Sequence, residues 1–167
     1  MLHARAALCV LCGLLTATAA CLAPAPAAER ATDAARELNV AARFGRMDIA
    51  LSRTSGSARE NFMRRRGEWG REMRVVDVEL AGMSMPDSEH AIVEVDYAWM
   101  RMSEGTLRTT RVAQHWHDTK GAWHLEREQR AAGDLGLFGE AVEVVQKPPR
   151  DVQFATKIIP ANEAAAD

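Results

Sequence analysis

The chain has 167 residues, of which 47% are hydrophobic and 26% charged, and its formal net charge is −2. This length allows one globular domain with a substantial core. The slight acidic excess excludes the basic character typical of nucleic-acid-binding proteins, so we expect no nucleic-acid partner.

The first 20 residues have the composition of a secretory signal peptide. Arg5 precedes an apolar run from Ala6 to Leu15, and small residues follow as far as Ala20. The run is too short to cross a membrane as a helix. We therefore expect secretion across the inner membrane, and removal of residues 1–20 would leave Cys21 as the sole cysteine, with no internal disulfide.

The residues from Thr18 to Cys21 resemble the bacterial lipoprotein signal. The resemblance implies that Cys21 becomes the first mature residue and carries a lipid such as palmitate. It predicts a membrane anchor in the cell envelope, facing the periplasm or the cell surface. Threonine stands at position 18, where the family usually has leucine, so ordinary signal cleavage after Ala20 remains the alternative.

Two helices are expected after an Ala/Pro-rich tether over residues 21–29. Thr32 is the expected N-cap of a first helix that runs to Phe44 and continues past Gly45. Ser57 is expected to cap a second helix from about Ala58. Its arginines alternate with glutamates, so we expect these arginines to face solvent: Arg59, Arg64, Arg65, Arg66 and Arg71.

Four strands are expected next, one from Met73 to Met85 and three between His90 and Gln129. Large apolar residues alternate with polar ones in the second strand, which is the pattern of a half-buried strand. A two-residue turn at 104–105 would place Tyr97 opposite Val112, and a four-residue turn at 118–121 would place Trp116 opposite Trp123. The apolar residues expected on one face are Val93, Val95, Tyr97, Trp99, Val112, Trp116, Trp123 and Leu125.

These elements predict a single α+β domain over residues 30–160. Further apolar runs cover 141–145 and 152–159, and residues 161–167 are expected to be frayed.

Two helices before a curved antiparallel meander resemble the nuclear transport factor 2-like superfamily. The resemblance covers roughly Ala31 to Arg130 and includes the Gly-Glu-Trp-Gly run at 67–70 and the aromatic hairpins. It implies N-terminal helices packed on a curved antiparallel sheet of four or more strands, with a cavity between them. A cystatin-like domain or a lipocalin-like half barrel is the alternative.

The aromatic face could line a ligand pocket or form an ordinary core. The candidate pocket residues are Tyr97, Trp99, Trp116 and Trp123, with Asp48 or Asp77 as an acid. Aromatic rings on the inner face of a sheet more often form core. In the superfamily that the chain resembles, the cavity serves isomerase or dehydratase chemistry, ligand holding or no known role. An enzyme of this type would use Tyr97 and an acid, although no catalytic residue can be assigned.

The polar face of the same strands offers a candidate metal site. The expected registers place Glu94 opposite His115 and His115 opposite His124, with His117 nearby. Imidazole and carboxylate groups bind Zn²⁺, but a surface ladder of Glu and His needs no metal. A three-residue turn would shift the register by one and place His124 behind Trp116.

Together these patterns favour a non-enzymatic cell-envelope lipoprotein, anchored through Cys21, that binds a small molecule or another envelope protein. A cavity enzyme and a metal carrier are the alternatives. A homodimer through the polar face of the sheet is a further expectation.

Overall fold

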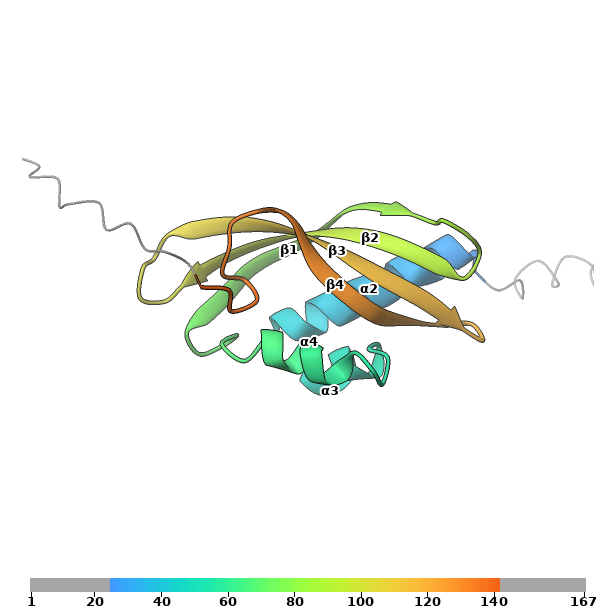
Figure 1. Ribbon diagram of the computed structural model, residues 1–167, viewed down its shortest axis with the longest axis horizontal. Helices are drawn as coiled ribbons and strands as arrows, with labels where there is room; N and C mark the ends of the chain where they lie inside the picture. The colour runs from blue at the N-terminus through green and yellow to red at the C-terminus, as the bar shows by residue number, and fades with distance from the viewer. Residues whose placement is uncertain (1–24, 142–167) are drawn as a thin grey trace, which may run out of the picture.

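The computed structural model describes residues 25–141, and it has an α+β architecture. Helices come first in the chain and a four-stranded antiparallel sheet follows, in the order β1-β2-β3-β4 (Figure 1). The elements are α2 (Ala27–Arg43), α3 (Met47–Ser52), α4 (Arg59–Arg65), β1 (Met73–Ser84), β2 (His90–Arg101), β3 (Leu107–Thr119) and β4 (Ala122–Gly133). The signal peptide, Cys21, the tail and the apolar runs beyond residue 141 lie outside the described residues.

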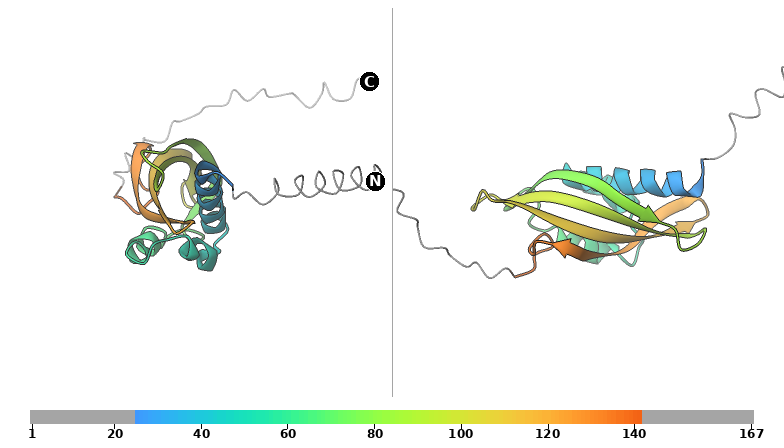
Figure 2. Two further views of the ribbon diagram at one scale, coloured as in Figure 1. Left: turned by 90° about the vertical axis from the view of Figure 1, so that its right-hand side faces the viewer. Right: turned by 90° about the horizontal axis from the view of Figure 1, so that it is seen from above.

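The sheet is strongly curved, and the helices close its concave side (Figure 2). Helix α2 packs against β1, β2, β4 and α3. The segment between α3 and α4 forms a parallel bridge to β4, from Thr54 to Leu125. No helix among residues 25–141 has both the length and the apolar character needed to span a bilayer.

Helix α2 begins at Ala27, directly after Pro26, rather than after Thr32 as expected. Proline fixes φ near the helical value, and the alanine-rich residues that follow have the highest helix propensity. Thr32 lies inside the helix, where its hydroxyl donates to the Ala28 carbonyl at 2.9 Å. The tether expected over 21–29 therefore overlaps the first helical turn.

Helix α2 ends before Gly45 instead of continuing past it. Gly45 has φ +73°, its N–H donates to the Ala42 carbonyl, and the Arg46 N–H donates to the Ala41 carbonyl at 2.8 Å. These two bonds form a Schellman motif, which needs a left-handed residue and so favours glycine. The chain turns there into α3 and leaves Phe44 at the surface.

The β2–β3 register differs from the expected one by two residues. Tyr97 lies opposite Thr110, and Val95 rather than Tyr97 lies opposite Val112. The expected two-residue turn at 104–105 is wrong, because β2 ends at Arg101 and the connection spans residues 102–106. Side chains alternate with a period of two, so a shift of two changes partners but keeps every residue on its face.

The β3–β4 turn is shorter than expected. Lys120 (φ 57°) and Gly121 (φ 90°) form a two-residue turn with both residues left-handed, as a type I′ hairpin requires. Thr119 therefore pairs with Ala122, and His117 rather than His115 lies opposite His124. The expected four-residue turn at 118–121 is wrong. Near the turn, the observed β3–β4 register again differs from the expected one by two residues.

The core lies between the concave face of the sheet and α2. In β1, a bulge near Val76 interrupts the register, and Val78 and Leu80 are partly buried against the core. The largest buried side chains are Trp99, Trp116, Trp123, Tyr97, Leu38, Met73, Leu125 and Leu137. The expected single apolar face of the sheet is thus confirmed.

Candidate functional site

The four aromatic residues of the expected pocket form part of the packed interior. Tyr97 and Trp99 are fully buried, and Trp116 and Trp123 are nearly so. The indole N–H of Trp99 donates to the Thr110 hydroxyl at 2.9 Å. The buried rings therefore act as core side chains and present no surface to solvent.

Tyr97 belongs to a buried group of polar side chains that the sequence did not indicate. Its hydroxyl donates to the side-chain oxygen of Asn39 on α2. Asn39 and Gln114 on β3 exchange two amide hydrogen bonds, each 2.9 Å long. Asn39 also donates to the Ala35 carbonyl at 2.8 Å. These bonds satisfy amides that would otherwise be costly to bury.

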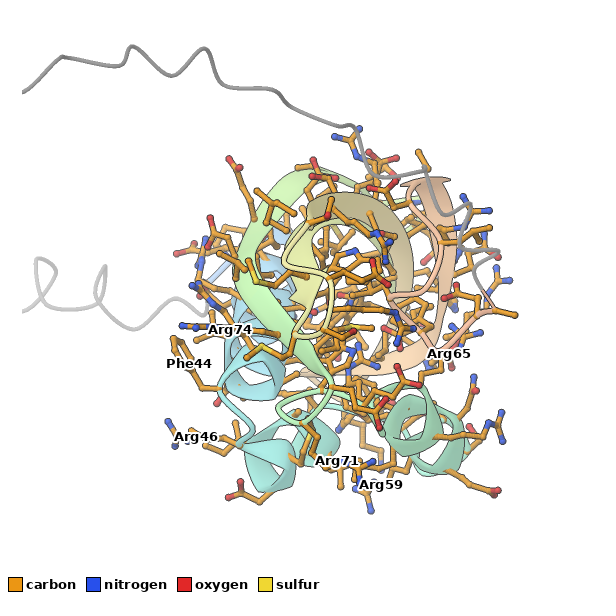
Figure 3. All side chains as sticks on the ribbon, turned by 90° about the vertical axis from the view of Figure 1, so that its left-hand side faces the viewer. Phe44, Arg46, Arg59, Arg65, Arg71 and Arg74 are labelled. Carbon is orange, nitrogen blue, oxygen red and sulfur yellow. The ribbon has the colours of Figure 1, made fainter. Side chains whose placement is uncertain are left out.

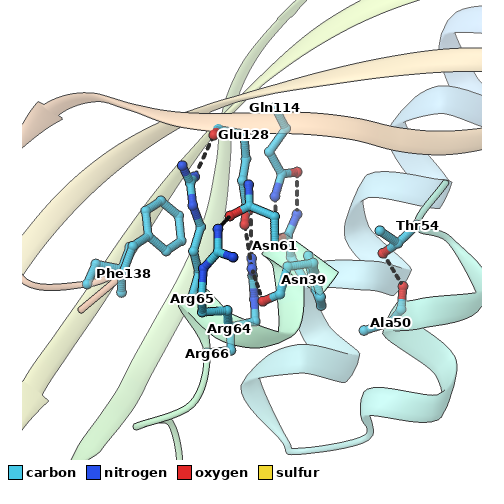
Figure 4. Close-up of polar contacts among 12 residues, drawn as sticks. Asn39, Ala50, Thr54, Asn61, Arg64, Arg65, Arg66, Gln114, Glu128 and Phe138 are labelled. Carbon is cyan, nitrogen blue, oxygen red and sulfur yellow. Dashed lines mark hydrogen bonds and ion pairs between the residues drawn. The ribbon is translucent and has the colours of Figure 1, made fainter. Parts of the chain in front are cut away.

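An ion pair between Arg66 and Glu128 lies in the same interior (Figure 4). Arg66 caps the C-terminal end of α4, and its guanidinium forms two hydrogen bonds to the carboxylate on β4. The guanidinium also lies 3.6 Å from the centre of the Phe62 ring and 4.8 Å from that of Trp69. The expected solvent-facing position of Arg66 is therefore wrong.

The sequence carried a signal for this burial. Phe62 precedes Arg66 by four residues, which places its ring on the same side of α4, and Trp69 follows three residues later in the turn after the helix. The alternation of arginines with glutamates in this segment instead indicated a solvent-facing helix. The burial of Glu128 could not be predicted either, because a bulge near His115 changes the register along β4.

The environment keeps Tyr97 protonated and Arg66 charged. Burial raises the pKa of the Tyr97 hydroxyl well above its ordinary value, and the nearby Arg66 guanidinium only partly offsets this. Burial opposes the charge on Arg66, but Glu128 outweighs it and the pKa of Arg66 is raised. Tyr97 therefore serves as a hydrogen-bond donor to Asn39 and is poorly suited to lose its proton in catalysis.

The acids expected beside Tyr97 lie elsewhere. Asp48 is exposed in the first turn of α3. Asp77 is exposed on β1, where it accepts a hydrogen bond from Arg43 at 2.9 Å. The structure therefore does not assemble the acid and phenol that the enzymatic alternative requires.

The polar face does not assemble the expected metal ligands either. Glu94 lies 3.6 Å from Arg111, and His115 lies opposite Arg127, whose guanidinium is 3.3 Å from His115 Nδ1. Burial, followed by the charge of Arg127, lowers the pKa of His115. Within residues 25–141, no three histidine, cysteine, aspartate or glutamate groups converge on one point.

The exposed feature that stands out is the end of the molecule around Phe44. Phe44 is 67% exposed and lies between two clefts. A cleft of about 320 Å³ lies between α2 and β1, and another of about 390 Å³ lies between α2 and α3. Figure 3 shows Phe44 between Arg46 and Arg74, with Arg71 on the same end of the molecule.

Comparison with known protein families, with curated proteins and with solved structures found no significant match to this chain.

Proposed function

We propose that this protein is a lipid-anchored, non-enzymatic binding module of the cell envelope that holds an acidic segment of another protein at its Phe44 end. The exposure of Phe44 between two clefts is the observation that carries the proposal. The tightly filled interior supports it, because binding then has to use the outer surface. Exposed aromatic residues beside arginine are typical of the central residues of protein interfaces.

The charge around Phe44 favours an acidic partner. Arg46, Arg71 and Arg74 are exposed and form no ion pair with any residue between 25 and 141. Most other arginines in this range are paired with a carboxylate, as Arg43 is with Asp77. Guanidinium groups bind carboxylates with two parallel hydrogen bonds, so unpaired arginines around an apolar side chain fit an acidic segment that carries an apolar residue.

The position of the tether favours a protein over the anchoring bilayer. Ala27 and Phe44 lie at opposite ends of α2, which is about 25 Å long at 1.5 Å per residue. With lipid on Cys21, the short segment before Pro26 holds the Ala27 end near the membrane. Phe44 then points away from the membrane, toward other envelope proteins.

The order of elements supports membership of the nuclear transport factor 2-like superfamily as part of this proposal. Helices precede a curved four-stranded antiparallel meander, as that resemblance implies. Fold membership does not choose a function, and the binding role rests on the surface around Phe44.

A photo-crosslinking amino acid at position 44 tests the binding surface in cells. We expect an adduct with an acidic envelope protein that disappears after the double change Arg46→Glu and Arg74→Glu. The matched control places the same amino acid at Met83, an exposed position at the other end of β1. Equal adducts at 44 and 83, or adducts that survive the charge reversal, would contradict the proposal.

Metabolic labelling with palmitate tests the anchor separately. We expect label on the wild-type protein and none on Cys21→Ser, with release of the variant from the membrane fraction. Label that persists in Cys21→Ser would overturn the anchor and leave the binding surface to be judged by its own experiment.

A further inference from the structure

A further cleft lies between α4, β4 and the segment that follows β4. Its volume is about 580 Å³, larger than that of either cleft beside Phe44, and it shares no lining residue with them. Arg64 and Arg65 in the last turn of α4 line it from one side, and Arg130 lines it from β4. Three positive charges from two elements therefore border one open space.

No carboxylate neutralises these three arginines within residues 25–141. Arg64 donates to the side-chain oxygen of Asn61 at 2.8 Å. Arg65 donates to a carbonyl of β4 at 2.6 Å (Figure 4), and Arg130 to the carbonyl at the end of β4 at 3.2 Å. These acceptors are all neutral. A guanidinium group carries five N–H donors, so each arginine keeps most of its donors for a ligand.

The two acids that line the cleft are already held by other groups. Glu68 forms an ion pair with Arg101 at 3.1 Å. Oε2 of Glu140 accepts hydrogen bonds from the backbone N–H groups of Gly136 at 3.1 Å and Phe138 at 2.9 Å. Because Glu68 is balanced by Arg101, three guanidinium groups face the single carboxylate of Glu140. The cleft therefore keeps an excess of positive charge.

The ring of Phe138 lies beside the arginines of α4. The central carbon of the Arg65 guanidinium is 5.0 Å from the ring centre, and that of Arg66 is 5.6 Å from it. Stacking on an aromatic ring holds a guanidinium in one orientation and leaves its N–H edge available to an oxyanion. Arg65 is thus ordered before a ligand arrives, which reduces the entropy lost on binding.

We infer that this cleft binds a phosphate group, to whose oxygens Arg64, Arg65 and Arg130 donate hydrogen bonds. Guanidinium groups form paired, charge-assisted hydrogen bonds with phosphate. A phosphate monoester carries about 1.5 to 2 negative charges at neutral pH, which balances three arginines less one glutamate. The volume is within the range of small-molecule sites, about 300 to 1,000 Å³, so the cleft also has room for the organic part of an ester.

Nuclear magnetic resonance titration of the ¹⁵N-labelled full chain tests this site. The probes are sodium phosphate and glycerol 3-phosphate, with glycerol as the uncharged reference. We expect shifts of the Nε–H signals of Arg64, Arg65 and Arg130 with both anions and none with glycerol. Tighter binding of glycerol 3-phosphate would identify an ester as the ligand, and tighter binding of inorganic phosphate would identify the free ion.

Replacing one arginine on each side of the cleft tests the assignment of the donors. Arg64→Gln and Arg130→Gln each remove a charged donor from an exposed position, and we expect about tenfold or more weaker binding in both. The backbone amide spectrum of each variant checks that the fold is retained. Wild-type protein that binds neither anion would overturn the inference.

Arg59→Gln and Arg127→Gln are the matched controls. Both arginines are exposed, lie on the same two elements and are outside the lining of the cleft. Each control changes the net charge by the same amount, so it reports general attraction of anions without loss of a donor. We expect binding within about twofold of wild type. A control that loses as much affinity as Arg64→Gln would overturn the site.

Discussion

Arg66 and Glu128 are 62 residues apart in the sequence, yet their side chains pair inside the protein with 0% and 3% of their surfaces exposed. The pair joins the end of α4 to β4 across the open side of the curved sheet. Arg65 adds a hydrogen bond from its guanidinium to the Glu128 carbonyl at 2.6 Å. The position of α4 is therefore fixed by ionic contacts as well as by apolar packing.

Replacing one partner of this ion pair should destabilise the fold strongly. Glu128→Gln leaves the Arg66 charge buried without compensation, and we expect a loss of about 3 to 5 kcal/mol in the free energy of unfolding. Urea denaturation followed by tryptophan fluorescence measures it. The double variant Arg66→Met with Glu128→Leu should recover most of the loss, because it removes both charges. A single variant as stable as wild type would contradict the buried pair.

Alkaline pH should unfold the protein through Tyr97. Burial raises the pKa of Tyr97 in the folded state above the unfolded value of about 10. The folded state therefore holds the proton more tightly, and its contribution to stability is complete below pH 10 and lost as the pH rises further. Tyr97 is the single tyrosine of the chain, so absorbance at 295 nm reports it alone. We expect no tyrosinate signal until unfolding begins.

The control for this titration is Tyr97→Phe. It removes the hydroxyl that donates to Asn39 and should cost about 1 kcal/mol at neutral pH. It should also flatten the dependence of stability on pH above 10. A tyrosinate signal that rises near pH 10 in folded wild-type protein would show that the hydroxyl is accessible.

Gly133 should tolerate no side chain. Its φ is +83°, and an added Cβ would lie 2.3 Å from the Thr109 carbonyl oxygen. Gly133→Ala must therefore push β4 away from β3, and we expect a loss of about 2 kcal/mol or more. Gly121→Ala is the matched control, since its φ is +90° with nothing within 4 Å of an added Cβ. Thermal unfolding of both variants separates collision from backbone strain, which alone costs about 1 to 2 kcal/mol.

Phe44→Ser should leave stability almost unchanged. The ring is exposed and lies beside the guanidinium of Arg43, whose central carbon is 5.2 Å from the ring centre. Such surface substitutions change the free energy of unfolding by about 0.5 kcal/mol or less. Differential scanning calorimetry measures it. A loss of several kcal/mol would mean that Phe44 supports the fold and not an interface.

The sequence predicted which face of the sheet each residue occupies better than it predicted which residues meet. Alternating hydrophobicity depends on a period of two, so the errors of two residues in the hairpin registers left Tyr97 and Trp116 on the correct side. Partners depend on turn length and on bulges. The two-residue turn at Lys120 and Gly121 moved the partner of His124 from His115 to His117, and the bulge near His115, which apolar patterning does not signal, placed Arg127 opposite His115.

The buried ion pair and the buried polar side chains were not predicted from the sequence. Patterning assigns arginines to solvent, and Arg66 could be recognised only by its aromatic neighbours Phe62 and Trp69. The side-chain hydrogen-bond partners of Asn39 are 58 and 75 residues away in the chain, at Tyr97 and Gln114, so no local pattern connects them. The helices and strands could be predicted because their signals are local, whereas the polar interior could not.

Through the bridge from Thr54 to Leu125, the protein's own backbone covers part of the exposed edge of β4. The Ser55 N–H donates to the Leu125 carbonyl, and the Leu125 N–H donates to the Arg53 carbonyl at 2.8 Å. A strand from a neighbouring molecule has no free amide or carbonyl to join at that point. The segment between the two short helices thus blocks strand addition at this position of the β4 edge.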